Sequence, residues 1–542
     1  MQESKTPLNY KDNKKNALTT ILKRFLAFIP QNIVRKILKS YQKELLDETE
    51  WIEGVVIFSD ISGFTPMSQA LSKFGSRGTE EMSLILNTYL SKMTNIIYKN
   101  HGILQKIAGD AMTVLFEKHS GEDWTVSLLR AVKCAFEMQK LISNKFRKIH
   151  SVAGEFSLAM KIGIAKGRLF NSTLGSYDFG IETCLMGKPI DLAVGAEHNA
   201  QQGEIWIHKE SLKNISDSVN IITDNNEYLR ISKSKEINIP KNNEESAFSV
   251  KLSTGDKERI INEVRNCVPP SIGKRIELGY HKFLGEHRKT SILFISFSGI
   301  SMENPDFEKQ LKTYYSNMQK IIARYRGTLY EFESGDKGYK IIALFGSPIS
   351  TEDDEISAVL CADAMQKAVK DIQWIESQKI GISTGYVFAG VIGTPLLSRY
   401  AVIGDKVNLS ARLMTVARNN TILVDSDTYK ATKSRFVWKK LPPRKLKGKE
   451  GNIQTYELSH VKDSKSYSPA EEMTYLIGRN EEVKRFVDIF DNVLNNNGQV
   501  AFVIGEMGMG KRSLIREFVE YSHKKFDILY YGAVCYNYGT QI

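Results

Sequence analysis

Two aspartates in the first fifth of the chain could bind metal ions. Asp60 lies near the end of a short apolar run, residues 55–61, and Asp110 lies in a predicted tight turn between two short strands. If the first strand lies beside this hairpin, both carboxylates meet at one edge of a sheet. Carboxylate oxygens are hard ligands that suit Mg²⁺ or Mn²⁺, and a pair of such ions can hold an in-line displacement at phosphorus. The residues alone leave a second interpretation open, in which the two aspartates cap adjacent loops.

Two glycine-containing segments could bind phosphate groups. Residues 62–65, Ser-Gly-Phe-Thr, predict a helix start, where backbone N–H groups attract anions. Near the C-terminus, Gly505, Gly510 and Lys511 have the spacing of a P-loop, between an apolar run (500–504) and a helical segment (514–521). Arg512 stands where Ser or Thr is expected, and Ser513 follows one position later. We expect a truncated regulatory NTPase module that at most binds nucleotide; a glycine-rich turn without a ligand is the alternative.

An internal repeat predicts the elements that position these residues. VVIFSDISGFT (55–65) resembles SILFISFSGIS (291–301), and MGKPID (186–191) resembles IGDKVN (403–408). Each unit combines apolar runs typical of buried strands, segments with apolar residues at helical spacing, and one hairpin. This order predicts an α+β fold with a mixed sheet that helices cover on one side. The predicted divisions are an N-terminal helical segment (1–44), a first unit (45–215), a linker (216–280), a second unit (281–460) and the P-loop module (470–542).

Four motifs resemble those of class III adenylyl and guanylyl cyclases: FSDISGFT (58–65), KIAGDA (106–111), GISTG (381–385) and VIGDKVNLSAR (402–412). The resemblance covers about residues 45–460. Tandem units without a membrane span, followed by a P-loop, are most similar to the soluble branch of that family. The resemblance implies two ferredoxin-like (βαββαβ) domains that pair as a pseudo-symmetric dimer within one chain, with one active site at their interface.

In the first unit, the resemblance assigns metal and phosphate binding. Asp60, Asp110 and the backbone carbonyl of Ile61 would hold two Mg²⁺ or Mn²⁺ ions. Lys161 would bind the triphosphate of the nucleotide. The helix start after Asp60 would contribute Gly63, Phe64 and Thr65 to nucleotide binding.

The second unit complements the first. Arg412 would stabilise charge on the α-phosphoryl group as pyrophosphate leaves, and Asn408 would orient the ribose. Ser296 and Tyr339 stand at the counterparts of the two metal-binding aspartates. We therefore expect one competent site, and a twin site that cannot do chemistry.

The twin site takes bicarbonate in the soluble branch of the family, through a lysine and an arginine. Lys106 matches that lysine, whereas Val194 stands at the arginine position. Only one cationic partner for a bicarbonate anion therefore remains, which argues against activation by bicarbonate.

The base that the site selects depends on the second hairpin. Adenylyl cyclases of the family use a lysine there and an Asp or Thr farther on, and guanylyl cyclases use a glutamate. Counting along the sequence puts Lys337 at the lysine position and Ala401 at the Asp/Thr position. An ammonium can donate to N1 of adenine, so we expect ATP rather than GTP. Glu331 and Glu333 lie just upstream, and a shifted hairpin would offer a carboxylate to guanine instead.

Composition restricts the partners and the compartment. The net charge is +12, from 74 Lys and Arg against 62 Asp and Glu, but no basic stripe interleaved with aromatic residues indicates nucleic-acid binding. Five scattered cysteines without a C-x-x-C pair fit a reducing compartment. No stretch has the length of a membrane span, so we expect a cytoplasmic protein. The amphipathic segment 21–38 predicts a helix packed on the first unit, or one lying on a membrane surface.

We therefore expect a monomeric enzyme with an internal pseudo-dimer that converts ATP to cyclic AMP and pyrophosphate. Conversion of GTP to cyclic GMP is the alternative for specificity. A catalytically silent nucleotide sensor and a P-loop ATPase with cyclase-like regulatory domains are alternatives of other classes.

Overall fold

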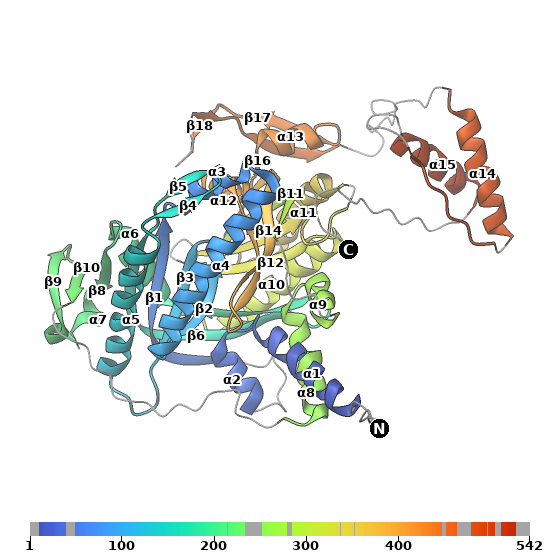
Figure 1. The fold of residues 1–542 in the computed structure, drawn as a ribbon. Helices are drawn as coiled ribbons and strands as arrows, with labels where there is room; N and C mark the ends of the chain where they lie inside the picture. The colour runs from blue at the N-terminus through green and yellow to red at the C-terminus, as the bar shows by residue number, and fades with distance from the viewer. Residues whose placement is uncertain are drawn as a thin grey trace, which may run out of the picture.

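Two sheets of the same topology form the body of the molecule in the computed structural model (Figure 1). The structure describes residues 10–39, 49–213, 215–233, 252–278, 285–335, 338–351, 353–446, 451–462, 478–495, 497–504 and 511–526. The strand order is β2-β3-β1-β6-β8-β10-β9 in the first sheet and β12-β13-β11-β14-β16-β20-β17 in the second. β7 pairs with β6, and β15 pairs with β14 in the same way. The predicted repeat is therefore a repeat of the whole α+β unit.

The first unit extends from β1 to β10. Its strands are β1 (Thr49–Ser62), β2 (Ile103–Ala108), β3 (Ala111–Glu117), β6 (Ala159–Ser176), β7 (Gly180–Met186), β8 (Ile205–His208), β9 (Val219–Asp224) and β10 (Tyr228–Lys233), with a small hairpin of β4 (Ile149–Ser151) and β5 (Gly154–Phe156). Its helices are α3 (Phe64–Ser72), α4 (Gly75–Lys99), α5 (Trp124–Lys145), α6 (Lys188–Asn199) and α7 (Lys209–Leu212). β9 and β10 belong to this sheet, so the expected end of the unit at residue 215 was too early.

The second unit repeats this arrangement. Its strands are β11 (Glu286–Ser298), β12 (Thr328–Gly335), β13 (Gly338–Phe345), β14 (Ser377–Gly393), β15 (Ser398–Ile403), β16 (Ile422–Val424), β17 (Phe436–Lys440) and β20 (Tyr456–Val461), with β18 (Arg444–Lys445) pairing β19 (Asn452–Ile453). Its helices are α10 (Phe307–Arg324), α11 (Asp354–Ala368), α12 (Asp405–Val416) and α13 (Ser426–Thr432).

Both faces of the first sheet are covered, because alternate residues of a strand point to opposite faces. Val55 and Ile57 of β1 share a buried core with α4 and α5. Val56, on the opposite face, packs with Ile190 and Ala193 of α6. The expectation of helices on one side only was therefore wrong, since the unbroken apolar run of β1 reflects burial on both faces.

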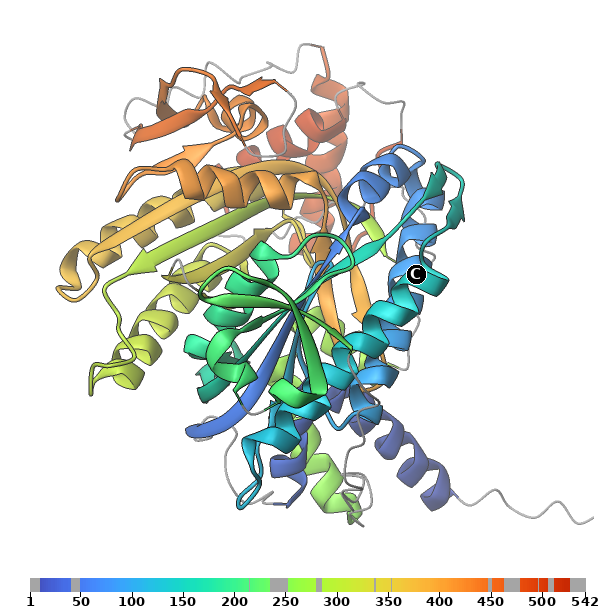
Figure 2. The same ribbon diagram turned by 90° about the vertical axis from the view of Figure 1, so that its left-hand side faces the viewer.

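Each unit extends two strands into the other unit (Figure 2). The far half of β14 and the strand β15 place Phe388 and Ala401 in the buried core of the first unit. The far half of β6 and the strand β7 place Phe170 and Met186 in the core of the second unit. Each unit thus completes its partner's core, which gives the pseudo-two-fold dimer within one chain.

The N-terminal and linker helices pack mainly against the second sheet. α1 (Tyr10–Leu26), α2 (Gln31–Lys39), α8 (Thr254–Val264) and α9 (Pro270–Glu277) share a buried cluster with Ile292 and Phe294 of β11. Phe25 and Val34 are fully buried in it. The expected packing of segment 21–38 on the first unit is met by α2, which contacts β2 and whose Asn32 accepts a hydrogen bond of 3.0 Å from Gln105. The apolar side of the segment also covers the outer face of the second sheet, which was not expected. That side is covered by protein. Among the described helices, none combines the length and apolar character that crossing a bilayer requires.

The C-terminal region contains two described helices, α14 (Asn480–Leu494) and α15 (Lys511–Lys525), which meet through Phe486, Phe490 and Phe518. The apolar run 500–504, which a P-loop would require to be a strand, forms no strand, and Val500 and Phe502 are 82% and 84% exposed. A lone apolar segment cannot form a strand without a neighbour to pair with. Gly505 and Gly510 lie outside the described residues, while Lys511 begins α15 and Ser513 lies in its first turn. The P-loop assignment stays a prediction.

Candidate active site

The structure brings Asp60 and Asp110 together at one end of the first sheet. β1 lies between β3 and β6, and Ser59 pairs with Met112 of β3. Asp60 therefore lies across from Ala111, next to Asp110, which occupies the turn between β2 and β3. The expected convergence of the two carboxylates is confirmed.

Burial and mutual repulsion disfavour the ionised form of both carboxyl groups. Burial raises the pKa of Asp60 to about 6; the charge of Glu197 adds to this shift, and Lys161 opposes it. Burial and the charge of Asp60 raise the pKa of Asp110 to about 7. The buried hydroxyl of Tyr89 lies close to both and has no hydrogen-bond partner among the described residues. A cation at this position would relieve the repulsion, so the donor set fits a divalent metal ion.

The metal ligands available are few. No group of three or more His, Cys, Asp or Glu side chains that could hold a metal occurs in the part of the chain that the structure describes. The two carboxylates and the backbone carbonyl of Ile61, which directly follows Asp60, are the protein ligands that the motif supplies. Such a set leaves room for substrate oxygens, as Mg²⁺ sites for nucleotides usually do.

Lys161 lies directly beside Asp60. The two residues pair across β6 and β1, and the ammonium of Lys161 lies 3.0 Å from Oε1 of Glu197 on α6. Glu197 is 4% exposed at its side chain, so it is a fixed partner. It holds the lysine next to the two carboxylates, where an ammonium can bind a phosphate group.

The helix α3 begins immediately after Asp60. Gly63 is its N-cap in the left-handed conformation (φ 95°), and a Cβ there would lie 2.4 Å from the carbonyl oxygen of Ser157. Only glycine fits such a turn. The N–H groups of Phe64 and Thr65 lie in the first turn, where a helix supplies no acceptor. They form a seat for an anion beside the metal-binding carboxylates.

The second unit faces this site with one stripe of α12. Asp405, Asn408 and Arg412 are spaced three and four apart, so they share one face of the helix. Asp405 accepts a hydrogen bond of 3.0 Å from Gln69 of α3, which places this face toward the first unit. Asn408 is exposed and Arg412 is half-buried, and neither has a polar partner among the described residues. Both groups are free to bind a ligand.

The twin site has an aromatic residue in place of the second aspartate. Strand register aligns Ser296 with Asp60 and Tyr339 with Asp110, as the sequence predicted. Tyr339 packs on Phe297 and Phe332, with ring centroids 5.5 and 5.9 Å apart. Burial and the charge of Asp191 on α6 raise the pKa of Tyr339 to about 12.

This twin arrangement supports the geometry of the first site. Asp191 is the α6 counterpart of Asn408, and it acts on Tyr339, the counterpart of Asp110. By the pseudo-two-fold symmetry, the face of α12 that carries Asn408 looks toward Asp110. This symmetry places the stripe of α12 on the side of the first unit that carries Asp110.

The hairpin position that selects the base differs from the expectation. Lys337 lies outside the described residues. Glu331 pairs with Ile342 as Lys106 pairs with Thr113, so Glu331 is the counterpart of Lys106. The expectation of Lys337 at this position was wrong, because the second hairpin is longer and the count ignored this.

Glu331 lies in an ion cluster that spans the interface. Its carboxylate is 2.7 Å from the ammonium of Lys106 and 2.8 Å from the guanidinium of Arg399 on β15. Lys106 also donates to the carbonyl of Phe332. The charge of Lys106 is thus already paired with a carboxylate of the chain. Ala401, two residues after Arg399, is 1% exposed.

Known proteins are similar to this chain over the same regions. The model of the adenylate and guanylate cyclase catalytic domain family matches residues 49–249 and 285–460, well over half of the chain. The chain therefore belongs to this family, and the resemblance of its motifs and the tandem-domain fold are confirmed.

The relatives differ in how much of the chain they match. Human adenylate cyclase type 10 is 25% identical over 512 residues, which cover 87% of this chain and 31% of the relative. Guanylate cyclase beta of Plasmodium falciparum is 42% identical over 91 residues, 16% of this chain and 3% of the relative. A class III adenylyl cyclase-like ATP-binding protein from Pseudomonas aeruginosa has a similar structure, with a TM-score of 0.49, 12% identity and coverage of 80% of this chain and 94% of that chain. This chain thus spans about a third of the length of its first curated relatives.

Several residues of the site escaped the sequence analysis. Glu197 holds Lys161, Tyr89 lies beside the carboxylates, and Arg399 binds Glu331. None belongs to a motif that the analysis used. The register of the two hairpins, compared as strands with a longer second turn, would have identified Glu331.

Proposed function

We propose that the chain is a purine nucleotide cyclase with one active site, at the interface of its two units. The observation that carries this proposal is the meeting of two complementary halves. The first unit supplies Asp60, Asp110 and Lys161, and the second supplies Asn408 and Arg412 on a stripe of α12 that docks on α3. A silent sensor has no physical need for both halves.

Two Mg²⁺ or Mn²⁺ ions would be held by Asp60, Asp110 and the carbonyl of Ile61. When bound, they supply positive charge for the triphosphate and lower the pKa of a coordinated hydroxyl. The raised pKa values of both carboxyl groups support this assignment, because an unscreened pair of carboxylates is unfavourable at this position.

The residues of the chain bind and orient the nucleotide. Lys161 and the N–H groups of Phe64 and Thr65 hold the phosphates. Asn408 positions the ribose so that its 3′-oxygen attacks the α-phosphorus. Arg412 stabilises the charge that develops there while the bond to the departing pyrophosphate breaks. The products are a cyclic nucleotide, pyrophosphate and the proton of the 3′-hydroxyl group.

ATP is the first candidate substrate. The similarity to adenylate cyclase type 10 extends over both units, and this supports ATP. GTP is the second candidate, and Glu331 favours it. This carboxylate could accept from N1–H and the 2-amino group of guanine. Lys106 and Arg399 already neutralise the Glu331 carboxylate, however, so it is a weaker acceptor for the base.

The test is product formation by purified protein with Mn²⁺, offering ATP and GTP separately and in competition, with mass spectrometry of the products. We expect cyclic AMP to predominate. If cyclic GMP predominates, Glu331 is the residue that recognises the base. Absence of both products would leave a nucleotide-binding module without catalysis.

A further inference from the structure

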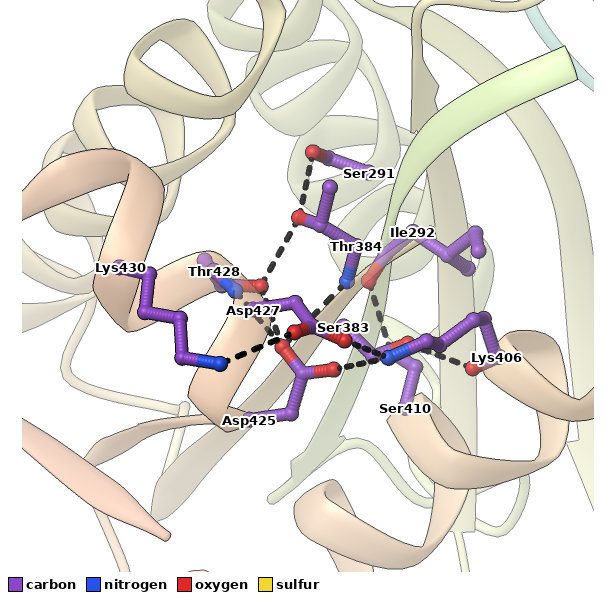
Figure 3. Close-up of polar contacts among 10 residues, drawn as sticks. All are labelled: Ser291, Ile292, Ser383, Thr384, Lys406, Ser410, Asp425, Asp427, Thr428 and Lys430. Carbon is purple, nitrogen blue, oxygen red and sulfur yellow. Dashed lines mark hydrogen bonds and ion pairs between the residues drawn. The ribbon is translucent and has the colours of Figure 1, made fainter. Parts of the chain in front are cut away.

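Lys406 of α12 has no role in the proposed site, yet its ammonium forms ion pairs with two carboxylates. Its ammonium lies 2.7 Å from Oδ2 of Asp425 and 2.6 Å from Oδ2 of Asp427 (Figure 3). Its side chain is 20% exposed. The stem lies over Gly385 of β14, where a Cβ would be 2.6 Å from Cε of the lysine.

Asp425, the buried partner of Lys406, is rigidly held. Asp425 is 3% exposed and caps the N-terminus of α13, where its Oδ1 accepts from the backbone N–H and the hydroxyl of Thr428. Burial alone would lower the pKa of Lys406, but the charges of Asp425 and Asp427 outweigh it and raise this pKa. The lysine is therefore a permanent cation fixed to the end of strand β16.

A second contact fixes the same side of α12 one turn farther on. The hydroxyl of Ser410 lies 2.7 Å from the carbonyl oxygen of Ile292 on β11 (Figure 3). It also lies 2.8 Å from the carbonyl oxygen of Gly381 on β14. Ser383 binds the carbonyl of Lys406. Lys406 and Ser410 are four residues apart, so they anchor one face of the helix.

The anchored face is opposite the face of the site. Asn408 follows Lys406 by two residues, and Arg412 follows Ser410 by two, which is about 200° around a helix with 3.6 residues per turn. The rotation of α12 about its axis is thus set on the sheet side by Lys406 and Ser410. The same rotation decides where Asn408 and Arg412 point.

The first unit contains an internal control. Strand register aligns Pro189 with Lys406, and a Cβ on Gly167, the counterpart of Gly385, would lie 2.8 Å from the proline ring. His208 and Ala193 stand where Asp425 and Ser410 stand in the second unit. α6 packs on its sheet without the charged anchor, so the fold does not need it. The anchor occurs in the unit whose helix carries Asn408 and Arg412.

We propose that Lys406 is a positioning residue for catalysis, which acts through its ion pairs with Asp425 and Asp427 to fix the rotation of α12 and so aim Arg412 and Asn408 at the nucleotide. This inference rests on the proposed function.

The test compares Lys406→Met with Lys430→Met. Lys430 lies 3.9 Å from the same Asp427, but it belongs to α13, is 73% exposed and does not touch α12. For each variant, kcat, the thermal midpoint and the Kd for the 3′-deoxy analogue of the preferred nucleotide are measured. The analogue binds but cannot cyclise, so it separates binding from chemistry.

We expect Lys406→Met to lower kcat by at least about tenfold, since small misplacements of catalytic groups have such effects, with Kd for the analogue within about threefold of wild type. Lys430→Met should keep wild-type kcat. A smaller loss in Lys406→Met, a parallel loss of analogue binding, or an equal loss in Lys430→Met would overturn the proposal. If Lys406→Met does not fold, Asp427→Asn replaces it, with an expected loss of about threefold or more; an unchanged kcat would overturn the proposal. An inactive wild type would instead count against the proposed function, and with it this inference.

Discussion

At the scale of single residues, the site depends on two carboxyl groups held where their charge is unfavourable. Asp60 and Asp110 have pKa values raised to about 6 and about 7, whereas exposed aspartates titrate near 4. Because the folded state holds these protons more tightly than the unfolded state does, the metal-free protein loses stability as pH rises from about 4 to about 7. Metal binding removes the protons, so it should strengthen over the same range.

This predicts a pH-dependent stabilisation by Mn²⁺. The metal should raise the thermal midpoint by several degrees at about pH 8, as expected for ~2–3 kcal/mol at saturating metal, and by much less at about pH 5.5. Asp110→Asn should abolish the shift and leave the metal-free protein folded. Differential scanning fluorimetry measures both effects, and Asp217→Asn, an exposed aspartate, is the matched control. A Mn²⁺ shift that persists in Asp110→Asn would contradict the metal assignment.

The motif residues of the first unit could be predicted from the sequence, whereas their supports could not. FSDISGFT and KIAGDA identify Asp60, Ile61 and Asp110 by type and spacing. Glu197 and Tyr89 lie on helices, and no sequence motif distinguishes them from the other residues of those helices. Their proximity to Asp60 follows from how α4 and α6 pack, which only the tertiary structure determines.

At the scale of elements, α12 is the part of the second unit that carries Asn408 and Arg412, the groups proposed to act on the nucleotide. It lies very close to its sheet, because a Cβ on Gly381 of β14 would be 2.2 Å from the backbone nitrogen of Met414 and 2.4 Å from the carbonyl oxygen of Ser410. The first unit has the same close approach at Gly163, against Ala193 of α6. Glycine at these two positions lets each helix lie flat on its strand.

Gly381→Ala should therefore displace α12 and the groups that it carries. We expect a destabilisation of about 1–3 kcal/mol from overpacking and a loss of kcat of about tenfold or more. Denaturant unfolding and steady-state kinetics measure the two effects. Gly498→Ala, where nothing lies within 4 Å of the new Cβ, should change neither. Full kcat in a destabilised Gly381→Ala protein would show that the placement of α12 does not limit catalysis.

Element boundaries were predictable where periodicity was strong. The apolar positions of α4 and α5 lie at helical spacing, and both segments form helices. The unbroken apolar run of β1 predicted a strand. It did not predict which elements cover the two faces of that strand, because an apolar run carries no information about its packing partners. The apolar side of α1 and α2 likewise predicted burial but only part of the surface that covers it, because the two helices pack on the second sheet as well as on the first unit.

At the scale of the whole molecule, the proposed site draws its residues from both units. Sequence comparison of the repeats predicted this division, because the aspartates occur in the first unit and Asn408 and Arg412 in the second. It failed in the second hairpin, where two extra residues on each strand lengthen the hairpin, so that Glu331 and not Lys337 is the counterpart of Lys106. The ion cluster of Glu331, Lys106 and Arg399 also joins the units, which no local pattern revealed.

The central claim is a single site built from both units, and its most direct test places one substitution in each unit. The rate of cyclic nucleotide formation is measured for wild type, Asp110→Asn, Arg412→Ala and an equimolar mixture of the two variants. Loss of a metal ligand or of the charge at the α-phosphoryl group removes several kcal/mol of transition-state stabilisation, so each variant should lose on the order of 10³-fold in rate. The mixture should stay as inactive as its components, since both halves of the site belong to one chain. An active wild type with near wild-type rates in either variant would contradict a single site built from both units.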